Sequence, residues 1–173
     1  AHLVHADFTR QSPKIIDFVF VGAHHQHLKN QSGVVFAQPF FPSKNNAGLG
    51  SAGVTSFYLD NSLSMQNELD NKRYLDFAAT KLDELLTVFQ NGTNLQLVTN
   101  DFDSREHELN TSGQLKERLA GVELSHTGRS FDNVYRRQQS LTAKHNPKGG
   151  NQLFWFSDFQ KSTAGELSKL KMD

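Results

Sequence analysis

One aspartate and two serines stand at alternating positions in the stretch "YLDNSLSM", residues 58 to 65. Asp60, Ser62 and Ser64 follow the apolar run "GVTSFYL", whose β-branched and aromatic residues are typical of a buried strand. A carboxylate and two hydroxyls are oxygen ligands of the kind that Mg²⁺ and Mn²⁺ prefer. The spacing therefore indicates either an oxygen-rich cation site or the cap of a helix, because Asp and Ser are also favoured capping residues.

Acidic residues also follow two other predicted strands. Asp101 and Asp103 lie at the end of "LQLVTNDF" (95 to 102), and Asp158 lies near the end of "NQLFWFSDF" (151 to 159). Ligands of open α/β sheets bind beyond the carboxyl ends of the strands, so we expect Asp158 to face Asp60 across one rim of the sheet. We interpret Asp101 and Asp103 as solvated loop residues, and a supporting role in the site stays open for Asp101.

Segments with the apolar periodicity of helices lie between these predicted strands. The segment 65 to 90 places apolar residues at spacings of three and four, namely Leu75, Ala78, Ala79, Leu82, Leu85, Leu86 and Phe89. The segment "SGQLKERLAG" predicts a short helix with Ser112 as its cap and Gly121 as its stop. A third helix is predicted over 130 to 145, and "NPKGG" ends it.

The order strand, helix, strand, helix, helix, strand predicts an α/β fold. We expect an open, mainly parallel sheet with helices on both faces and right-handed crossovers. Three strands make a small sheet. Either "KIIDFVFV" (14 to 21) adds to it, or the chain is part of a longer protein. A Gly/Asn/Ser-rich linker at 43 to 53 predicts an N-terminal segment at 1–50 and an α/β domain, which could be truncated, at 51–173.

The composition narrows the classes of function. The chain of 173 residues carries 18 basic and 18 acidic side chains, and this balance does not favour nucleic acid as a partner. The absence of cysteine excludes disulfides, thiolate zinc sites and cysteine catalysis. No apolar run approaches the roughly 20 residues of a membrane-spanning helix. The histidines at 24, 25 and 27 lack a matched pair at zinc spacing and are interpreted as a solvated loop.

"DNSLS" matches the D-x-S-x-S motif of the metal-ion-dependent adhesion site in von Willebrand factor A domains. This resemblance implies a Rossmann-like fold in which the motif follows the first core strand and opens the first long helix. It also implies that Asp158 of "FSDF" completes the cation site. The family expects a threonine from an intermediate loop. In "HTGRSFDNVYRR", Ser130 stands at that place, and Thr127 is the other choice.

A narrower resemblance involves both ends of the chain. "VFAQPFFP", "YLDNSLSM", "FSDFQKS" and "HLVHADFTRQSPKIIDFVFV" resemble segments of the membrane-anchored aerotolerance-type (Bat) proteins of Bacteroidetes. In these proteins an N-terminal double-transmembrane region precedes a von Willebrand A-like domain. The resemblance implies a domain held at a bacterial inner membrane and facing the periplasm, anchored by membrane segments that are absent from this chain.

Three functions follow as expectations. The first is a non-enzymatic, adhesion-type module in which Mg²⁺ or Mn²⁺ keeps an open position for an acidic side chain of another protein. The second is a scaffold whose metal site is degenerate. The third is a haloacid-dehalogenase-like phosphohydrolase with Asp60 as nucleophile. That chemistry needs a second aspartate two residues later as proton donor, and this position is Ser62.

Overall fold

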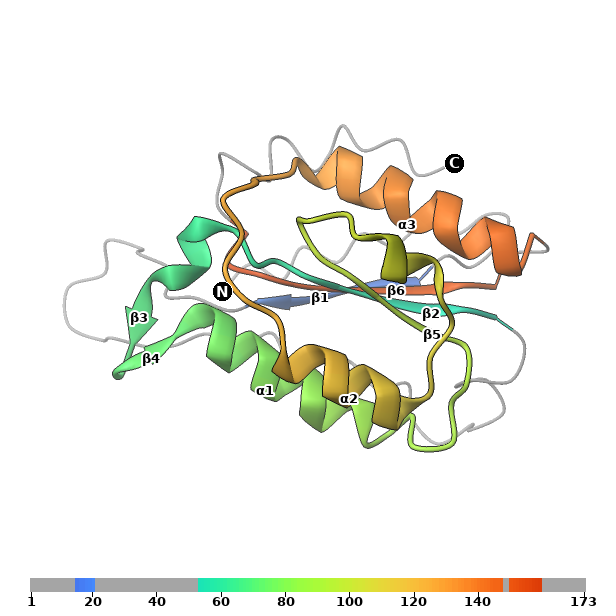
Figure 1. The fold of residues 1–173 in the computed structure, drawn as a ribbon, viewed down its shortest axis with the longest axis horizontal. Helices are drawn as coiled ribbons and strands as arrows, with labels where there is room; N and C mark the ends of the chain where they lie inside the picture. Colours follow the sequence, from blue (N-terminus) through green and yellow to red (C-terminus); the bar gives the residue numbers. More distant parts are fainter. Residues whose placement is uncertain (1–14, 21–52, 148–149, 160–173) are drawn as a thin grey trace.

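Four parallel strands form the central sheet of the computed structural model, which describes residues 15–20, 53–147 and 150–159. The strands are β1 (Ile15–Phe20), β2 (Thr55–Leu59), β5 (Leu95–Val98) and β6 (Gln152–Ser157), and they lie side by side in the order β1-β6-β2-β5. Helices cover both faces of this open sheet (Figure 1). The predicted α/β class with a parallel sheet is confirmed.

Alternation along the strands creates two separate cores. Successive side chains of a strand point to opposite faces, so Phe57 and Leu59 lie on one side of β2 and Tyr58 lies on the other. The first core packs against α1 (Tyr74–Leu86) and α2 (Ser112–Ala120). The second packs against α3 (Phe131–His145), where Phe131 contacts Trp155.

The chain reverses its direction of winding beside β2. It leaves β2 through α1 to reach β5 on one side, and it returns through α3 to β6 on the other side. β2 and β6 pair in parallel, with Phe57 opposite Phe154 and Leu59 opposite Phe156. The carboxyl ends of these two strands therefore flank the topological switch point, where open α/β sheets bind their ligands.

The long helix after β2 begins later than the D-x-S-x-S resemblance implies. A short 3-10 helix, η1 (Leu63–Gln66), follows the motif, and a two-stranded hairpin comes next, formed by β3 (Glu68–Leu69) and β4 (Lys72–Arg73). The hairpin turn uses Asp70 and Asn71 at φ values of 51° and 60°. These residue types tolerate the left-handed region that a two-residue hairpin turn requires. The expectation that the motif opens the first long helix is therefore wrong.

The cap of α2 differs from the prediction by one residue. Thr111 is the N-cap, and it forms a capping box with Gln114: each side chain accepts a hydrogen bond from the other residue's backbone N–H. The Ser112 hydroxyl instead donates to the carbonyl oxygen of Leu86 at 2.8 Å, which ties α2 to α1. Gly121 is the C-cap, as predicted.

The strand β1 joins the sheet beside β6, with Ile15 opposite Gln152. "KIIDFVFV" thus contributes a strand to the sheet, which was one of the two alternatives that the sequence left open. The division into 1–50 and 51–173 stays a prediction, and the linker at 43 to 53 lies almost wholly outside the described residues, as does the histidine cluster.

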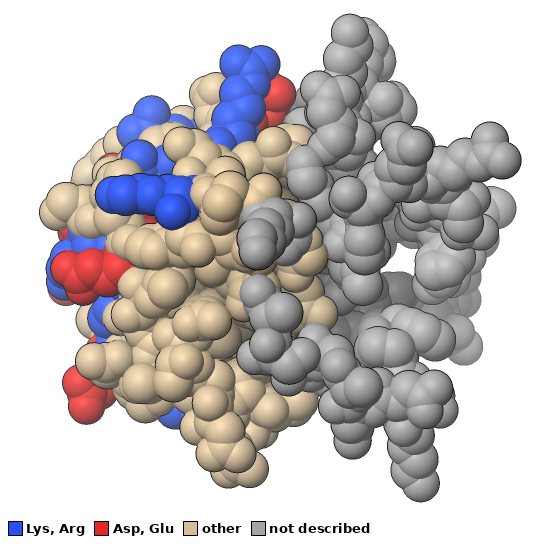
Figure 2. Space-filling model, turned by 90° about the vertical axis from the view of Figure 1, so that its right-hand side faces the viewer, with Lys and Arg blue, Asp and Glu red and all other residues tan. Residues whose placement is uncertain are grey.

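None of the described helices is long and apolar enough to cross a lipid bilayer. Figure 2 views the molecule from the end at which the strands begin. On the described part of this surface, charged side chains lie toward the margins with uncharged residues between them. The candidate functional residues lie at the opposite end, where the strands finish.

Candidate functional site

Asp60 follows β2 directly and is almost completely buried, with 1% of its surface exposed. Its Oδ1 accepts hydrogen bonds from the backbone N–H of Ser62 at 3.0 Å and from Nδ2 of Asn100 at 2.8 Å. Its Oδ2 accepts one from the Ser157 hydroxyl at 2.6 Å. A carboxylate has about four acceptor positions, so one position on Oδ2 remains for a further donor or a cation.

The two motif serines lie together. The Oγ atoms of Ser62 and Ser64 are 3.0 Å apart, Ser62 is buried, and Ser64 is partly exposed. Ser62 is the first residue before η1, but its side chain makes no capping hydrogen bond. The long helix α1 begins only at Tyr74, after the hairpin. Capping of a long helix therefore does not explain these residues.

Asp158 lies at the same rim of the sheet as Asp60. It follows Ser157, the last residue of β6, and β6 is the parallel neighbour of β2. Ser157 itself bonds to the Asp60 carboxylate, and the backbone N–H of Asp60 donates to the carbonyl oxygen of Phe156 at 2.9 Å. The predicted adjacency of the two strand ends is what the structure shows, and Asp158 is partly exposed there.

The loop from 121 to 130 crosses this rim between α2 and α3 (Figure 1). Ser125 attaches the loop to the motif: its backbone N–H donates to the carbonyl oxygen of Asn61 at 2.7 Å, and it forms a parallel bridge with Ser62. Thr127 donates its backbone N–H to the Ser125 hydroxyl at 3.1 Å. Ser130 is the N-cap of α3, where its hydroxyl accepts the Asn133 N–H at 3.4 Å. The ligand roles of Ser130 and Thr127 stay predictions.

Two buried asparagines organise the rim, and the sequence alone did not identify them. Asn61 donates to Asp101 Oδ2 at 2.9 Å and to the Glu123 carbonyl oxygen at 2.8 Å. Its own Oδ1 accepts the backbone N–H of Asn100 at 2.9 Å. Asp101 also accepts the Ser125 hydroxyl at 2.6 Å, so this exposed carboxylate connects the motif with the crossing loop.

Asn100 joins the site to the core beneath α3. Its side-chain oxygen accepts the Tyr58 hydroxyl at 2.8 Å, while its Nδ2 donates to Asp60. These two bonds fix the orientation of the amide. Burial raises the pKa of Tyr58 well above its ordinary value, and the negative charge of Asp60 adds to the shift. Tyr58 therefore remains a neutral donor and maintains this arrangement.

The hydroxyl pair has a geometry that suits a small divalent cation. Neighbouring ligands of an octahedral Mg²⁺ lie about 3.0 Å apart when the metal–oxygen bonds are about 2.1 Å long. The separation of 3.0 Å between the two Oγ atoms matches that value, and it equally permits a hydrogen bond between them. Among the described residues, no group of three or more His, Cys, Asp or Glu side chains could hold a metal ion. A cation here would depend on hydroxyls and water as well as carboxylates.

Comparison of the chain with family models, with curated proteins and with solved structures found no match in any of the three.

Proposed function

We propose that the rim formed by the ends of β2 and β6 is a divalent-cation-dependent site for binding another protein. The observation that carries the proposal is the pair of hydroxyls, on Ser62 and Ser64, held 3.0 Å apart next to the buried Asp60 carboxylate at the switch point of the sheet. Asp158 follows the neighbouring strand end and would supply the second acidic group. Mg²⁺ or Mn²⁺ would be the cation.

Binding fits this chemistry better than catalysis. A phosphohydrolase of the haloacid-dehalogenase type would use Asp60 as a nucleophile, but Asp60 is buried and its carboxylate already accepts three hydrogen bonds. These donors stabilise the negative charge and lower the nucleophilicity of the oxygens. Ser62, where that reaction needs an acid, is not acidic. We therefore propose a non-enzymatic module.

The ligand chemistry also indicates what the partner presents. Two neutral hydroxyls reduce the charge of the cation less than carboxylates would, so the metal retains affinity for an anionic oxygen. An Asp or Glu side chain of another protein is the simplest such ligand. The resemblance to membrane-anchored Bat proteins supports a place at a bacterial inner membrane, with this domain facing the periplasm and the anchor in segments outside this chain.

A pull-down from a bacterial membrane extract tests the proposal. The bait is the full chain, prepared as wild type, as a Ser62→Ala/Ser64→Ala variant and as a matched Ser104→Ala/Ser140→Ala variant that alters two exposed serines. We expect a partner that binds wild type and the matched variant with Mg²⁺, and that is lost with EDTA or with the motif variant. Partners that are indifferent to both treatments would contradict the proposal.

The second candidate is a scaffold whose metal site is degenerate. The separation of 3.0 Å between the two serine hydroxyls favours it, because at this distance they can hydrogen-bond to each other without a metal. The same experiment separates the candidates. A partner that needs neither the cation nor the motif serines would assign binding to another surface and leave the rim with a structural role.

A further inference from the structure

Phe102 has a backbone conformation that bulky side chains rarely adopt. It lies between β5 and the short 3-10 helix η2 (Ser104–His107), and its φ value of 52° is in the left-handed region. Such a conformation is strained and persists only where surrounding contacts impose it. The partly buried side chain packs against the core beneath α3. The fold therefore holds an aromatic ring at this place against a cost in backbone strain.

Two guanidinium groups lie over this ring. The Cζ atom of Arg129 is 4.5 Å from the ring centroid, and the Cζ atom of Arg137 is 5.3 Å from it. Both distances are within the range of a cation–π interaction. Two like charges beside one ring also repel each other, so each is stabilised by an anion that balances it.

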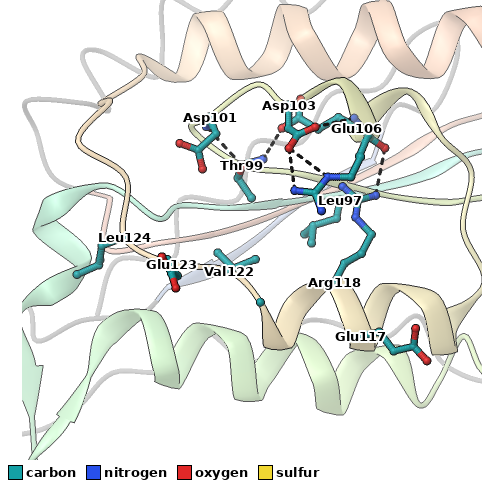
Figure 3. A pocket seen from close by; sticks show the side chains of 12 residues that line it. Leu97, Thr99, Asp101, Asp103, Glu106, Glu117, Arg118, Val122, Glu123 and Leu124 are labelled. Atoms are coloured by element: carbon teal, nitrogen blue, oxygen red, sulfur yellow. Dashed lines mark hydrogen bonds and ion pairs between the residues drawn. The ribbon is translucent and has the colours of Figure 1, made fainter.

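Arg137 has such an anion. Its Nε donates to the Glu106 carboxylate at 3.2 Å, and that carboxylate is almost completely buried. The neighbouring carboxylate of Asp103 pairs with Arg105, whose hydrogen bonds hold the pKa of Asp103 well below its ordinary value. Figure 3 shows the side chain of Asp101 pointing away from Asp103 and Glu106. These pairs leave neither carboxylate for the second guanidinium.

Arg129 has no carboxylate partner in the described part of the chain. Its Nε donates to the carbonyl oxygen of Asn100 at 3.0 Å. This bond uses one of the five N–H donors of the guanidinium, and no described residue accepts from the other four, which belong to the Nη atoms. Asp101 accepts hydrogen bonds from Asn61 and Ser125 instead. The partly exposed Arg129 thus keeps a fork of donors for an external anion.

The contacts of Arg129 connect it to the candidate rim. It lies in the loop that crosses the rim (Figure 1). Asn100, whose carbonyl oxygen it contacts, also donates its side-chain amide to Asp60 at 2.8 Å. The N-terminus of α3, capped by Ser130, follows directly, and its partial positive charge adds to that of the guanidinium. The unpaired cationic group therefore stands beside the place assigned to the metal.

We propose that Arg129 binds a carboxylate of the partner protein, beside the position that the cation would take. The guanidinium fork matches the two oxygens of a carboxylate. The bond to Asn100 and the Phe102 ring orient the fork before a ligand arrives, which lowers the entropy lost on binding. The partner would then present two acidic side chains, one to the cation and one to Arg129. The inference rests on the proposed function, because the carboxylates of Asp60 and Asp158 repel an anionic ligand unless a cation offsets their charge.

NMR titration of the full chain with short acidic peptides tests the ligand. The probe is a capped Gly-Asp-Gly-Asp-Gly peptide with Mg²⁺ present, and the comparison peptide has Asn in place of both Asp residues. We expect the two-acid peptide to shift the Nε–H signal of Arg129 and the Asn peptide to leave it unchanged. Absence of a shift with the two-acid peptide, or equal shifts with both peptides, would overturn the proposal.

A variant of Arg129 tests whether the second acid binds there. In wild type, the two-acid peptide should bind at least about fivefold more tightly than a capped peptide with a single Asp. In Arg129→Gln the ratio should fall to about two, the statistical factor for two equivalent acids. The matched control Arg136→Gln removes an exposed arginine that pairs with Asp132, and should keep the wild-type ratio. Equal ratios in wild type and Arg129→Gln, or equal losses in both variants, would contradict a carboxylate position at Arg129.

Removal of the cation separates this inference from the proposed function. EDTA or the Ser62→Ala/Ser64→Ala variant should weaken binding of the two-acid peptide. If neither does so while Arg129→Gln weakens it, the cation site fails and the carboxylate position at Arg129 stands. If both do so while Arg129→Gln has no effect, the cation site stands and the carboxylate position fails.

Discussion

Asn100 is the single residue on which the rim depends most. Its amide joins the Tyr58 hydroxyl to the Asp60 carboxylate, and its backbone N–H donates to Asn61. Neither asparagine could be singled out in the sequence, because these contacts join positions 39 to 42 residues apart and a lone Asn carries no spacing signal. By contrast, Asp60, Ser62 and Ser64 were found because they are close in sequence and follow a strand.

Asn100→Ala should lower the free energy of unfolding by about 2–4 kcal/mol, because the buried Tyr58 hydroxyl loses its hydrogen-bond acceptor and the buried Asp60 carboxylate loses one of its three hydrogen bonds. Urea denaturation measures the change. The control is Asn91→Ala, which alters an exposed asparagine and should change stability by less than about 0.5 kcal/mol. Equal stabilities of the two variants would mean that the amide of Asn100 does not hold Asp60.

Two buried glutamines differ in their hydrogen bonds, so we predict that replacing each by leucine changes the stability in opposite directions. Both side-chain polar atoms of Gln96 are buried and find no hydrogen-bond partner among the described residues, whereas Gln138 donates to Ser56 and accepts from Trp155. Gln96→Leu should raise the free energy of unfolding by about 1–2 kcal/mol. The buried amide loses its hydration without gaining a hydrogen bond, and a leucine side chain avoids that cost. Gln138→Leu should lower it by about 1–3 kcal/mol, because Ser56 and Trp155 lose their partner. A destabilised Gln96→Leu variant would show that the side chain has a partner such as internal water.

At the scale of elements, apolar periodicity predicted the strands and helices, and local polar signals decided their ends. The helix after β2 was predicted over residues 65 to 90, but it begins at Tyr74 because Asp70 and Asn71 form a hairpin turn. That dipeptide between Leu69 and Lys72 was a usable signal. Likewise, Thr111 with Gln114 three residues later is the pattern of a capping box, which outweighs Ser112 as the cap of α2.

Ser130, at the start of α3, is the predicted cation ligand from the loop between α2 and α3, and its substitution tests that role. Ser130 caps this helix, so Ser130→Ala should lower the free energy of unfolding by about 1 kcal/mol. The cap geometry predicts that affinity for Mn²⁺ is unchanged, and titration calorimetry measures it. The matched change Thr111→Ala removes the cap of α2 far from the motif. A loss of Mn²⁺ affinity in Ser130→Ala alone would establish the ligand role that the resemblance implies.

At the scale of the whole molecule, the order of the strands explains why the candidate residues meet. β2 lies between β5 and β6, and the helices that connect these strands cover opposite faces, so the ends of β2 and β6 flank a switch point. This rim was predictable from the alternation of strands and helices. The placement of β1 and β5 at the two edges of the sheet was not, because the sequence does not say which strand lies at an edge.

Paramagnetic broadening by Mn²⁺ in amide-resolved NMR spectra tests the central claim most directly. With substoichiometric Mn²⁺, we predict broadening centred on residues 60–64 and on Ser157 and Asp158, reversed by excess Mg²⁺ and absent in the Ser62→Ala/Ser64→Ala variant. The matched Ser104→Ala/Ser140→Ala variant should broaden as wild type does. Broadening centred on residues away from this rim, or equal broadening with and without the motif hydroxyls, would contradict a cation site there.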